Sequence, residues 1–150
     1  MNYKKILVAV DASENARRAV EYVGEIVGQS LGFEITLLYV VRHAERDLFP
    51  DDKSWENRKK QDKEKAQHVL VELETLLHTH GLSEDMVSTK LLEISNFSIA
   101  QAIMDYQKSE GFGTIVVGRR GMTKAEEFLF GSISNKIVHY AKNCAVWVIE

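Results

Sequence analysis

The chain has 150 residues, a length typical of one domain, and we expect a single domain over residues 1–150. Its formal net charge of −3 argues against nucleic acid or an anionic membrane as a partner. The single cysteine, Cys144, excludes an intramolecular disulfide framework. The sequence contains neither a signal peptide nor an apolar run of about 18 residues, so we expect a cytoplasmic protein.

The first part of the chain alternates a strand pattern with a helix pattern. Residues 4–10 form an apolar, β-branched run that is typical of a strand buried on both faces. Ser13 then stands at an N-cap position, and apolar residues at helical spacing predict a helix over 14–29, with Gly32 marking its end. Residues 33–41 predict a second buried strand.

The middle of the chain is the most highly charged part. Residues 42–65 contain the only proline and charges of both signs, and they predict a surface loop that runs into an exposed helix start. Apolar residues repeat at three and four over 66–80, which predicts a helix that Gly81 stops. Residues 86–94 indicate a weaker strand.

Two further helix and strand patterns complete the chain. Ser95 and Asn96 are expected to cap a third helix, and residues 113–118 predict a strand. Ser132 is expected to open the last helix, and residues 145–149 predict the final strand. This alternation of strands and helices predicts an α/β fold built from parallel βαβ units, with helices on both faces of the sheet.

In a parallel sheet of this kind, ligands bind beyond the carboxyl ends of the strands. Asp11 follows the first strand, Val40 and Val41 end the second, and Gly118 ends the fourth. Because a glycine has no Cβ, the backbone around Gly118 and Gly121 could approach a ligand closely. Each of these residues taken alone has an ordinary structural explanation, and their joint occurrence points to a ligand site.

The start of the last helix has the second feature of such a site. Gly131 and Ser132 stand where several backbone amides have no partner within the helix and where its macrodipole is positive. This position favours phosphate binding. Together with the glycine turn at residues 118–121, it could hold neighbouring phosphates of one polyphosphate.

The segment GRRGMTKAEEFLFGS at residues 118–132 fits the pattern Gly-x2-Gly-x9-Gly-Ser/Thr, and by it the chain resembles the nucleotide-binding members of the universal stress protein family. The opening KKILVAVDASENARRAV and the closing SISNKIVHYAKNCAVWVI resemble the first and last elements of that family. The resemblance implies a Rossmann-like, doubly wound, five-stranded parallel sheet of order 3-2-1-4-5. It also implies a role in the stress response.

The same resemblance implies how an adenine nucleotide, ATP or another, would be held. Asp11 would contact the adenine end, and backbone groups of Val40 would close on the base. Gly118 and Gly121 would wrap the ribose and the first phosphates.

At the other end of the nucleotide, Gly131, Ser132 and the amide of Ile133 would hold the distal phosphates. Mg²⁺ would be shared among the phosphates, because the sequence offers no dedicated metal cage and no histidines at metal-ligand spacing. Arg119 and Arg120 either reach a phosphate or are simply solvated.

No P-loop motif and no recognisable nucleophile arrangement is present in the sequence, so we expect a binding protein and not an enzyme, with slow ATP hydrolysis left open. Two rival functions remain. A phosphoreceiver domain has a similar sheet, but the third strand here does not end in aspartate. A dimeric adaptor with a vestigial pocket is the other rival.

In the implied sheet order residues 145–149 form an apolar edge, which predicts a homodimer through that strand.

Overall fold

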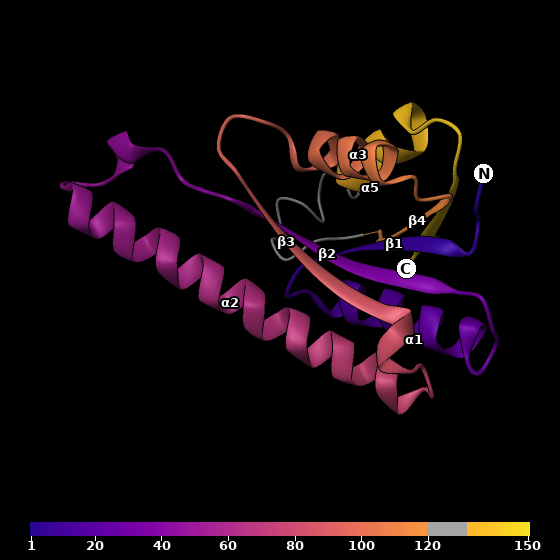
Figure 1. Ribbon diagram of the computed structural model, residues 1–150. Helices are drawn as coiled ribbons and strands as arrows, with labels where there is room; N and C mark the ends of the chain where they lie inside the picture. Colours follow the sequence, from indigo (N-terminus) through magenta and orange to yellow (C-terminus); the bar gives the residue numbers. More distant parts are fainter. Residues whose placement is uncertain (120–131) are drawn as a thin grey trace.

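The computed structural model describes residues 1–119 and 132–150, and it consists of one parallel sheet between two layers of helices (Figure 1). The strands, in chain order, are β1 (Lys5–Val10), β2 (Glu34–Arg42), β3 (Val87–Ile94), β4 (Thr114–Gly118) and β5 (Ala145–Ile149). The sheet order is β3-β2-β1-β4-β5, and every pairing is parallel. The expected fold class and strand order are therefore confirmed.

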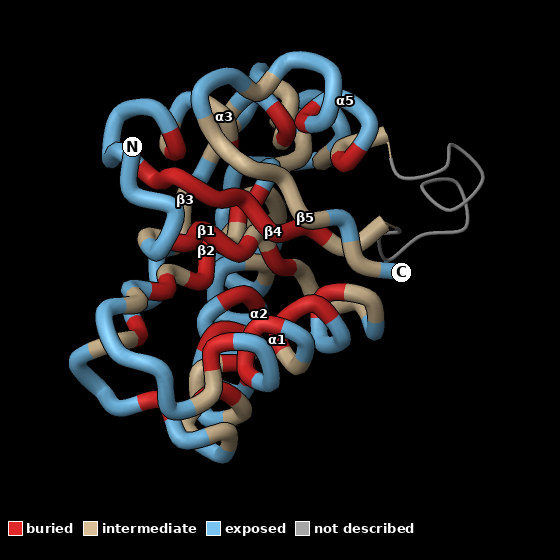
Figure 2. Tube along the Cα trace, turned by 90° about the vertical axis from the view of Figure 1, so that its right-hand side faces the viewer, coloured by how far each residue is buried: buried red, intermediate tan, exposed pale blue. Residues whose placement is uncertain are grey.

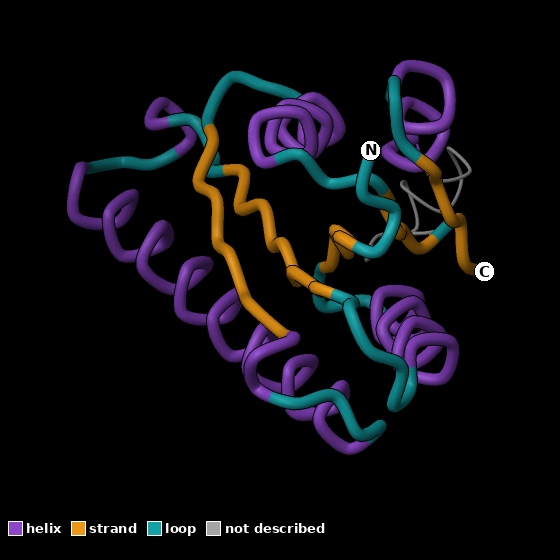
Figure 3. Tube along the Cα trace, turned by 45° about the vertical axis from the view of Figure 1, so that its right-hand side comes forward, coloured by secondary structure: helices purple, strands orange, loops and turns teal. Residues whose placement is uncertain are grey.

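The described helices divide between the two faces of the sheet (Figures 1 and 3). Their bounds are α1 (Glu14–Val27), α2 (Asp52–Thr79), α3 (Ile99–Glu110) and α5 (Ser132–Tyr140), with short 3-10 turns η1 (Arg46–Leu48) and η2 (Glu84–Met86). Helices α1 and α2 cover one face, and α3 and α5 cover the other. Crossovers between parallel strands are almost always right-handed, and this rule accounts for helices on both faces of the sheet.

The core lies on both sides of the central strands, and Figure 2 shows β1 and β4 buried along most of their length. Successive residues of a strand point to opposite faces. In β1, Ile6 and Val8 accordingly pack toward α1 and α2, whereas Leu7 packs toward α3 and α5. The continuous apolar run at the start of the sequence is thus explained by burial on two faces.

Two predicted helix boundaries are wrong. Helix α1 ends at Val27 and not at residue 29, because Gly28 adopts φ +49° and donates its amide to the Gly24 carbonyl at 2.8 Å. Helix α3 is capped by Ser98, whose Oγ accepts from the Gln101 amide at 3.0 Å, and not by residues 95 and 96. Those two residues belong to the crossover that follows β3.

Helix α2 is much longer than its buried part. It has 28 residues and begins at Asp52, where Asp51 caps it by accepting from the Ser54 amide at 2.7 Å. Its buried residues begin only at Ala66, so the first half is an exposed, charged rod that projects beyond the other helices (Figures 1 and 3). The predicted exposed helix start is confirmed. Within the described residues, no helix combines the length and apolar character needed to cross a membrane.

Candidate functional site

A hollow opens at the carboxyl ends of β1, β2 and β4, between α1, α3 and the start of α5. It contains about 680 Å³ of empty space, part of which is open solvent. Its described lining residues are Ala9, Val10, Asp11, Ser13, Ala16, Leu38, Val40, Ile99, Ile103, Val117, Gly118, Arg119, Ser132, Ile133 and Ser134. The structure therefore brings together five of the residues expected from the sequence: Asp11, Val40, Gly118, Ser132 and Ile133.

Asp11 shapes the turn that joins β1 to α1. Its Oδ1 accepts from the Ser13 amide at 2.8 Å, and Ser13 Oγ in turn accepts from the Ala16 amide at 3.1 Å to cap the helix. The other carboxylate oxygen of Asp11 accepts no hydrogen bond from the described residues. This oxygen is free to accept a hydrogen bond from a ligand.

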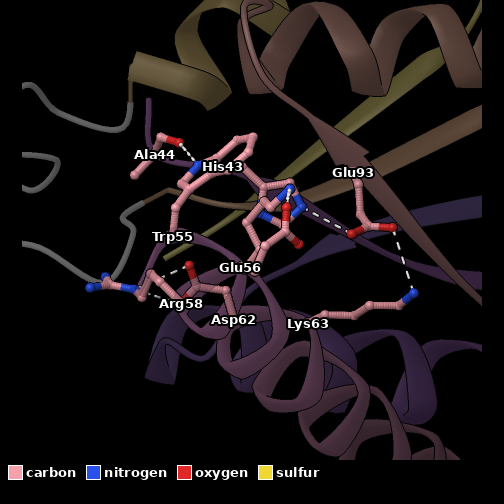
Figure 4. Close-up of polar contacts among 9 residues, drawn as sticks. His43, Ala44, Trp55, Glu56, Arg58, Asp62, Lys63 and Glu93 are labelled. Carbon is pink, nitrogen blue, oxygen red and sulfur yellow. Dashed lines mark hydrogen bonds and ion pairs between the residues drawn. The ribbon is translucent and has the colours of Figure 1, made fainter. Parts of the chain in front are cut away.

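The negative charge of Asp11 also acts on Tyr39, a residue of the neighbouring strand β2. Burial raises the pKa of the Tyr39 phenol, and the nearby carboxylates of Asp11 and Asp62 raise it further. Asp62, on α2, is paired with Arg58, whose Nε lies 3.1 Å from Asp62 Oδ1 (Figure 4), so Asp11 supplies the negative charge at the end of β1. Phosphate is disfavoured here, whereas N–H and O–H donors of a ligand are favoured.

The floor of the hollow is apolar. Leu38 and Val40 come from β2, Val117 from β4, and Ile99 and Ile103 from α3 at a spacing of four residues. Sequence reasoning named only Val40 among these five. The spacing of Ile99 and Ile103 was visible in the sequence, but apolar residues at that spacing also serve a core.

The start of α5 forms the opposite, positive end. Ser132 and Ile133 belong to the first turn of α5, where the backbone amides have no acceptor within the helix. Ser134, which the sequence reasoning missed, is buried there and donates its hydroxyl to the Arg119 carbonyl at 3.4 Å. The macrodipole of α5 makes this end suitable for anions.

Gly118 packs closely against the first turn of α1. A Cβ at this position would lie 3.1 Å from the main-chain carbon and oxygen of Asn15, in the first turn of α1. The side-chain nitrogen of Asn15, Nδ2, is itself buried and has no hydrogen-bond partner among the described residues. The structure thus gives Gly118 a structural role, and its expected contact with a ligand stays a prediction.

Arg119 forms an ion pair at the edge of the sheet. Its Nη1 lies 3.0 Å from Glu150 Oε1, and its amide donates to the Ile149 carbonyl at 2.7 Å. The side chain is also 39% exposed, so its two interpretations, contact with a phosphate and solvation, both stay predictions. Arg120, Gly121 and Gly131 lie outside the described residues, and their expected roles stay predictions.

The sequence model of the universal stress protein family matches residues 2–150. The chain belongs to this family. Universal stress protein MJ0531 of Methanocaldococcus jannaschii is 26% identical over 148 residues, which cover 99% of this chain and 82% of that protein.

Solved structures of universal stress proteins have the same fold. UspA from Lactobacillus plantarum superposes with a TM-score of 0.77 at 22% identity, over 100% of this chain and 99% of that one. The universal stress protein from Archaeoglobus fulgidus in complex with dAMP gives a TM-score of 0.68 at 21% identity, over the full length of both chains. The resemblance to the family is therefore confirmed, and the phosphoreceiver alternative is excluded.

Proposed function

We propose that this universal stress protein is a single-domain, cytoplasmic, adenine-nucleotide-binding protein of the stress response, and that its ligand is ATP. The observation that carries the proposal is the polarity of the hollow. An apolar floor that suits a flat base lies between an acidic end and a helix N-terminus. An adenine nucleotide has the same order of groups, with its base at one end and its phosphates at the other. The Archaeoglobus fulgidus relative in complex with dAMP supports this class of ligand.

Five described residues of the hollow have a role in this proposal. Asp11 accepts a hydrogen bond at the adenine end, and Val40 lies against the base. Gly118 borders the ribose and the first phosphate. The amide of Ile133 and the hydroxyl and amide of Ser132 donate to the distal phosphates.

Mg²⁺ is proposed to bind through the phosphates. Among the described residues, no three His, Cys, Asp or Glu side chains form a group that could hold a metal ion. A magnesium ion held by phosphate oxygens and water needs no such group, since Mg²⁺ keeps several waters when it binds nucleotides. We propose a binding module and not a catalyst, with a slow ATPase and a dimeric adaptor as alternatives.

Calorimetric titration tests the proposed function. ATP, ADP and AMP should each bind at one site per chain in the presence of Mg²⁺, because all three share the adenine and the first phosphate. Absence of heat with all three nucleotides would favour the adaptor. Rapid release of phosphate from ATP would instead contradict the assignment as a non-enzyme.

The edge strand β5 supports the proposed homodimer. The Ala145 amide donates to the Gly113 carbonyl, and the Ile149 carbonyl accepts from the Arg119 amide. Alternate residues of a strand form backbone hydrogen bonds to the same neighbouring strand. The backbone groups of Val146 and Val148 therefore point away from β4, toward the edge of the sheet. Among the described residues no strand pairs with this apolar edge, and such an edge favours pairing with a second copy.

Replacing Val146 with proline is expected to produce a folded monomer. Proline removes an amide that points away from β4, so the pairing within the sheet is retained while the pairing across the edge is lost. Light scattering measures the change in mass, and circular dichroism checks the fold. Val146→Ala keeps the amide and should remain dimeric. A folded Val146→Pro dimer would place the interface elsewhere.

A further inference from the structure

The hollow that is proposed to bind the nucleotide has a single cation among its described lining residues, Arg119. This residue directly follows β4, and its amide donates to the Ile149 carbonyl at 2.7 Å, so the ladder between β4 and β5 extends by one residue. Its own carbonyl accepts from the Ser134 hydroxyl, in the first turn of α5, at 3.4 Å. Arg119 therefore borders the helix start at which the distal phosphates are proposed to bind.

The alternation of β4 and β5 directs the Arg119 side chain toward the face of the sheet that carries α5. Gly118 lies against Asn15 of α1, and Ile149, its partner on β5, packs toward α1 and α2. Successive residues of a strand point to opposite faces. The next residues along the two strands, Arg119 and Glu150, consequently point to the face that α3 and α5 cover.

The guanidinium of Arg119 is paired with a carboxylate at this face. Its Nη1 lies 3.0 Å from Glu150 Oε1, and both side chains are exposed, Glu150 to 68%. An ion pair between exposed side chains contributes little to stability, because water and salt screen it. Exchanging Glu150 for another anion therefore costs Arg119 little.

A nucleotide with several phosphates needs a positive partner of this kind. The start of α5 supplies the equivalent of only about half an elementary charge. Asp11 adds a negative charge to the described lining, and ATP remains an anion when it carries Mg²⁺. A guanidinium presents a planar fork of N–H donors that fits a phosphate as well as a carboxylate. Arg119 is thus the described lining residue whose charge and shape suit phosphate oxygens.

We propose that Arg119 binds the phosphates of the nucleotide and that Glu150 competes with them for its guanidinium. This inference rests on the proposed nucleotide-binding function and adds a residue that makes the site favour ATP over adenosine. When ATP enters the hollow, Arg119 exchanges the Glu150 carboxylate for phosphate oxygens. No covalent bond changes and no proton moves. Adenosine has no phosphate, and the ion pair stays intact when it binds.

Calorimetric titration with ATP and with adenosine, both in the presence of Mg²⁺, tests the role of Arg119. Arg119→Gln removes the charge and keeps a polar side chain, so it should weaken ATP binding by about tenfold or more. Adenosine should lose much less affinity, and its binding also shows that the hollow of the variant is folded. Equal losses for the two ligands, or no loss with ATP, would overturn the proposal.

Glu150→Gln tests the competition. Glutamine leaves the guanidinium free for phosphate, so ATP should bind about two- to fivefold more tightly, the range expected from the loss of an exposed ion pair. Glu84→Gln is the matched control, because Glu84 is an exposed carboxylate in η2, before the amino end of β3, and its loss changes the net charge equally. The same gain in both variants would reduce the effect to net charge and would contradict a role for Glu150.

A double variant shows whether Glu150 acts through Arg119. When Arg119 is already glutamine, Glu150→Gln should change ATP binding no further, because no guanidinium remains to be released. A role of Glu150 that does not involve Arg119 would give the same gain with and without the arginine. That additive result would overturn the exchange.

The NMR signal of the Arg119 Nε–H group reports the exchange of partners directly. It should shift when the native protein binds ATP and stay in place when adenosine binds. A signal that ATP binding leaves unshifted would overturn the proposal. Absence of binding of both ligands to the native protein would overturn the proposed function and this inference together. ATP binding that Arg119→Gln does not weaken would overturn this inference alone.

Discussion

Replacing Gly113 with alanine is expected to lower the free energy of unfolding by about 3 kcal/mol. A Cβ at this position would lie 2.1 Å from the carbonyl oxygen of Asn2 and 2.7 Å from the amide nitrogen of Tyr3. Both are backbone atoms, so no side chain can rotate to make room. The backbone of Asn2 and Tyr3 would have to move away from residue 113, which directly precedes β4.

The hydrogen bonds on both sides of this contact prevent an easy adjustment. The Gly113 amide donates to the Lys5 carbonyl at 3.0 Å, and its own carbonyl accepts from the Ala145 amide at 2.9 Å. On the other side, the Asn2 carbonyl accepts from the Lys5 amide at 3.1 Å. Moving either strand apart would break at least one of these bonds.

Gly111→Ala is the matched control for Gly113→Ala. A Cβ at residue 111 meets nothing within 4 Å, but the residue has φ +75°, so alanine there should cost only about 1 kcal/mol of conformational strain. Thermal unfolding should show the Gly113 variant melting lower than the native protein by about 10 °C. Equal losses for the two variants would mean that the segment before β1 moves aside freely.

Replacing Ser132 with aspartate is expected to weaken ATP binding by tenfold or more and AMP binding by less. The aspartate would stand in the first turn of α5, where a negative charge stabilises a helix, so the fold should be retained. The same charge would face the distal phosphates of ATP, and a repulsion of about 1.4 kcal/mol already gives a tenfold loss. AMP has no distal phosphate to repel.

Ser132→Asn is the control for the aspartate variant, since asparagine has the same shape without the charge. ATP should bind Ser132→Asn within a few-fold of the native protein. Calorimetry with ATP and AMP on both variants gives the four affinities. Equal losses of ATP and AMP in Ser132→Asp would show that the start of α5 does not face the distal phosphates.

The fold could be predicted from the sequence because its strands and helices have different patterns of apolar residues. The apolar runs at residues 4–10 and 113–118 identify central strands, which are buried on both faces. The ends of the helices were harder to predict. Gly32 was expected to mark the end of α1, but Gly28 lies four residues earlier, adopts φ +49° and ends the helix at Val27.

The lining of the hollow was predictable where its residues follow strands or open helices, as Asp11 and Ser132 do. Its apolar floor was not, because Leu38 and Ile103 satisfy the same pattern as core residues. The contact between His43 and Glu93 could not be predicted from the sequence either. The two residues are 50 positions apart, and only the pairing of β2 with β3 brings them together.

The amide NMR spectrum with and without AMP tests the central claim most directly, since it reports which part of the chain a nucleotide contacts. The account predicts that AMP shifts the amides of Asp11, Ser13 and Val40 at the carboxyl ends of β1 and β2. It also predicts that the amides around His43 remain in place. Binding of AMP that leaves the three strand-end amides unshifted would contradict the assignment of this hollow to an adenine nucleotide.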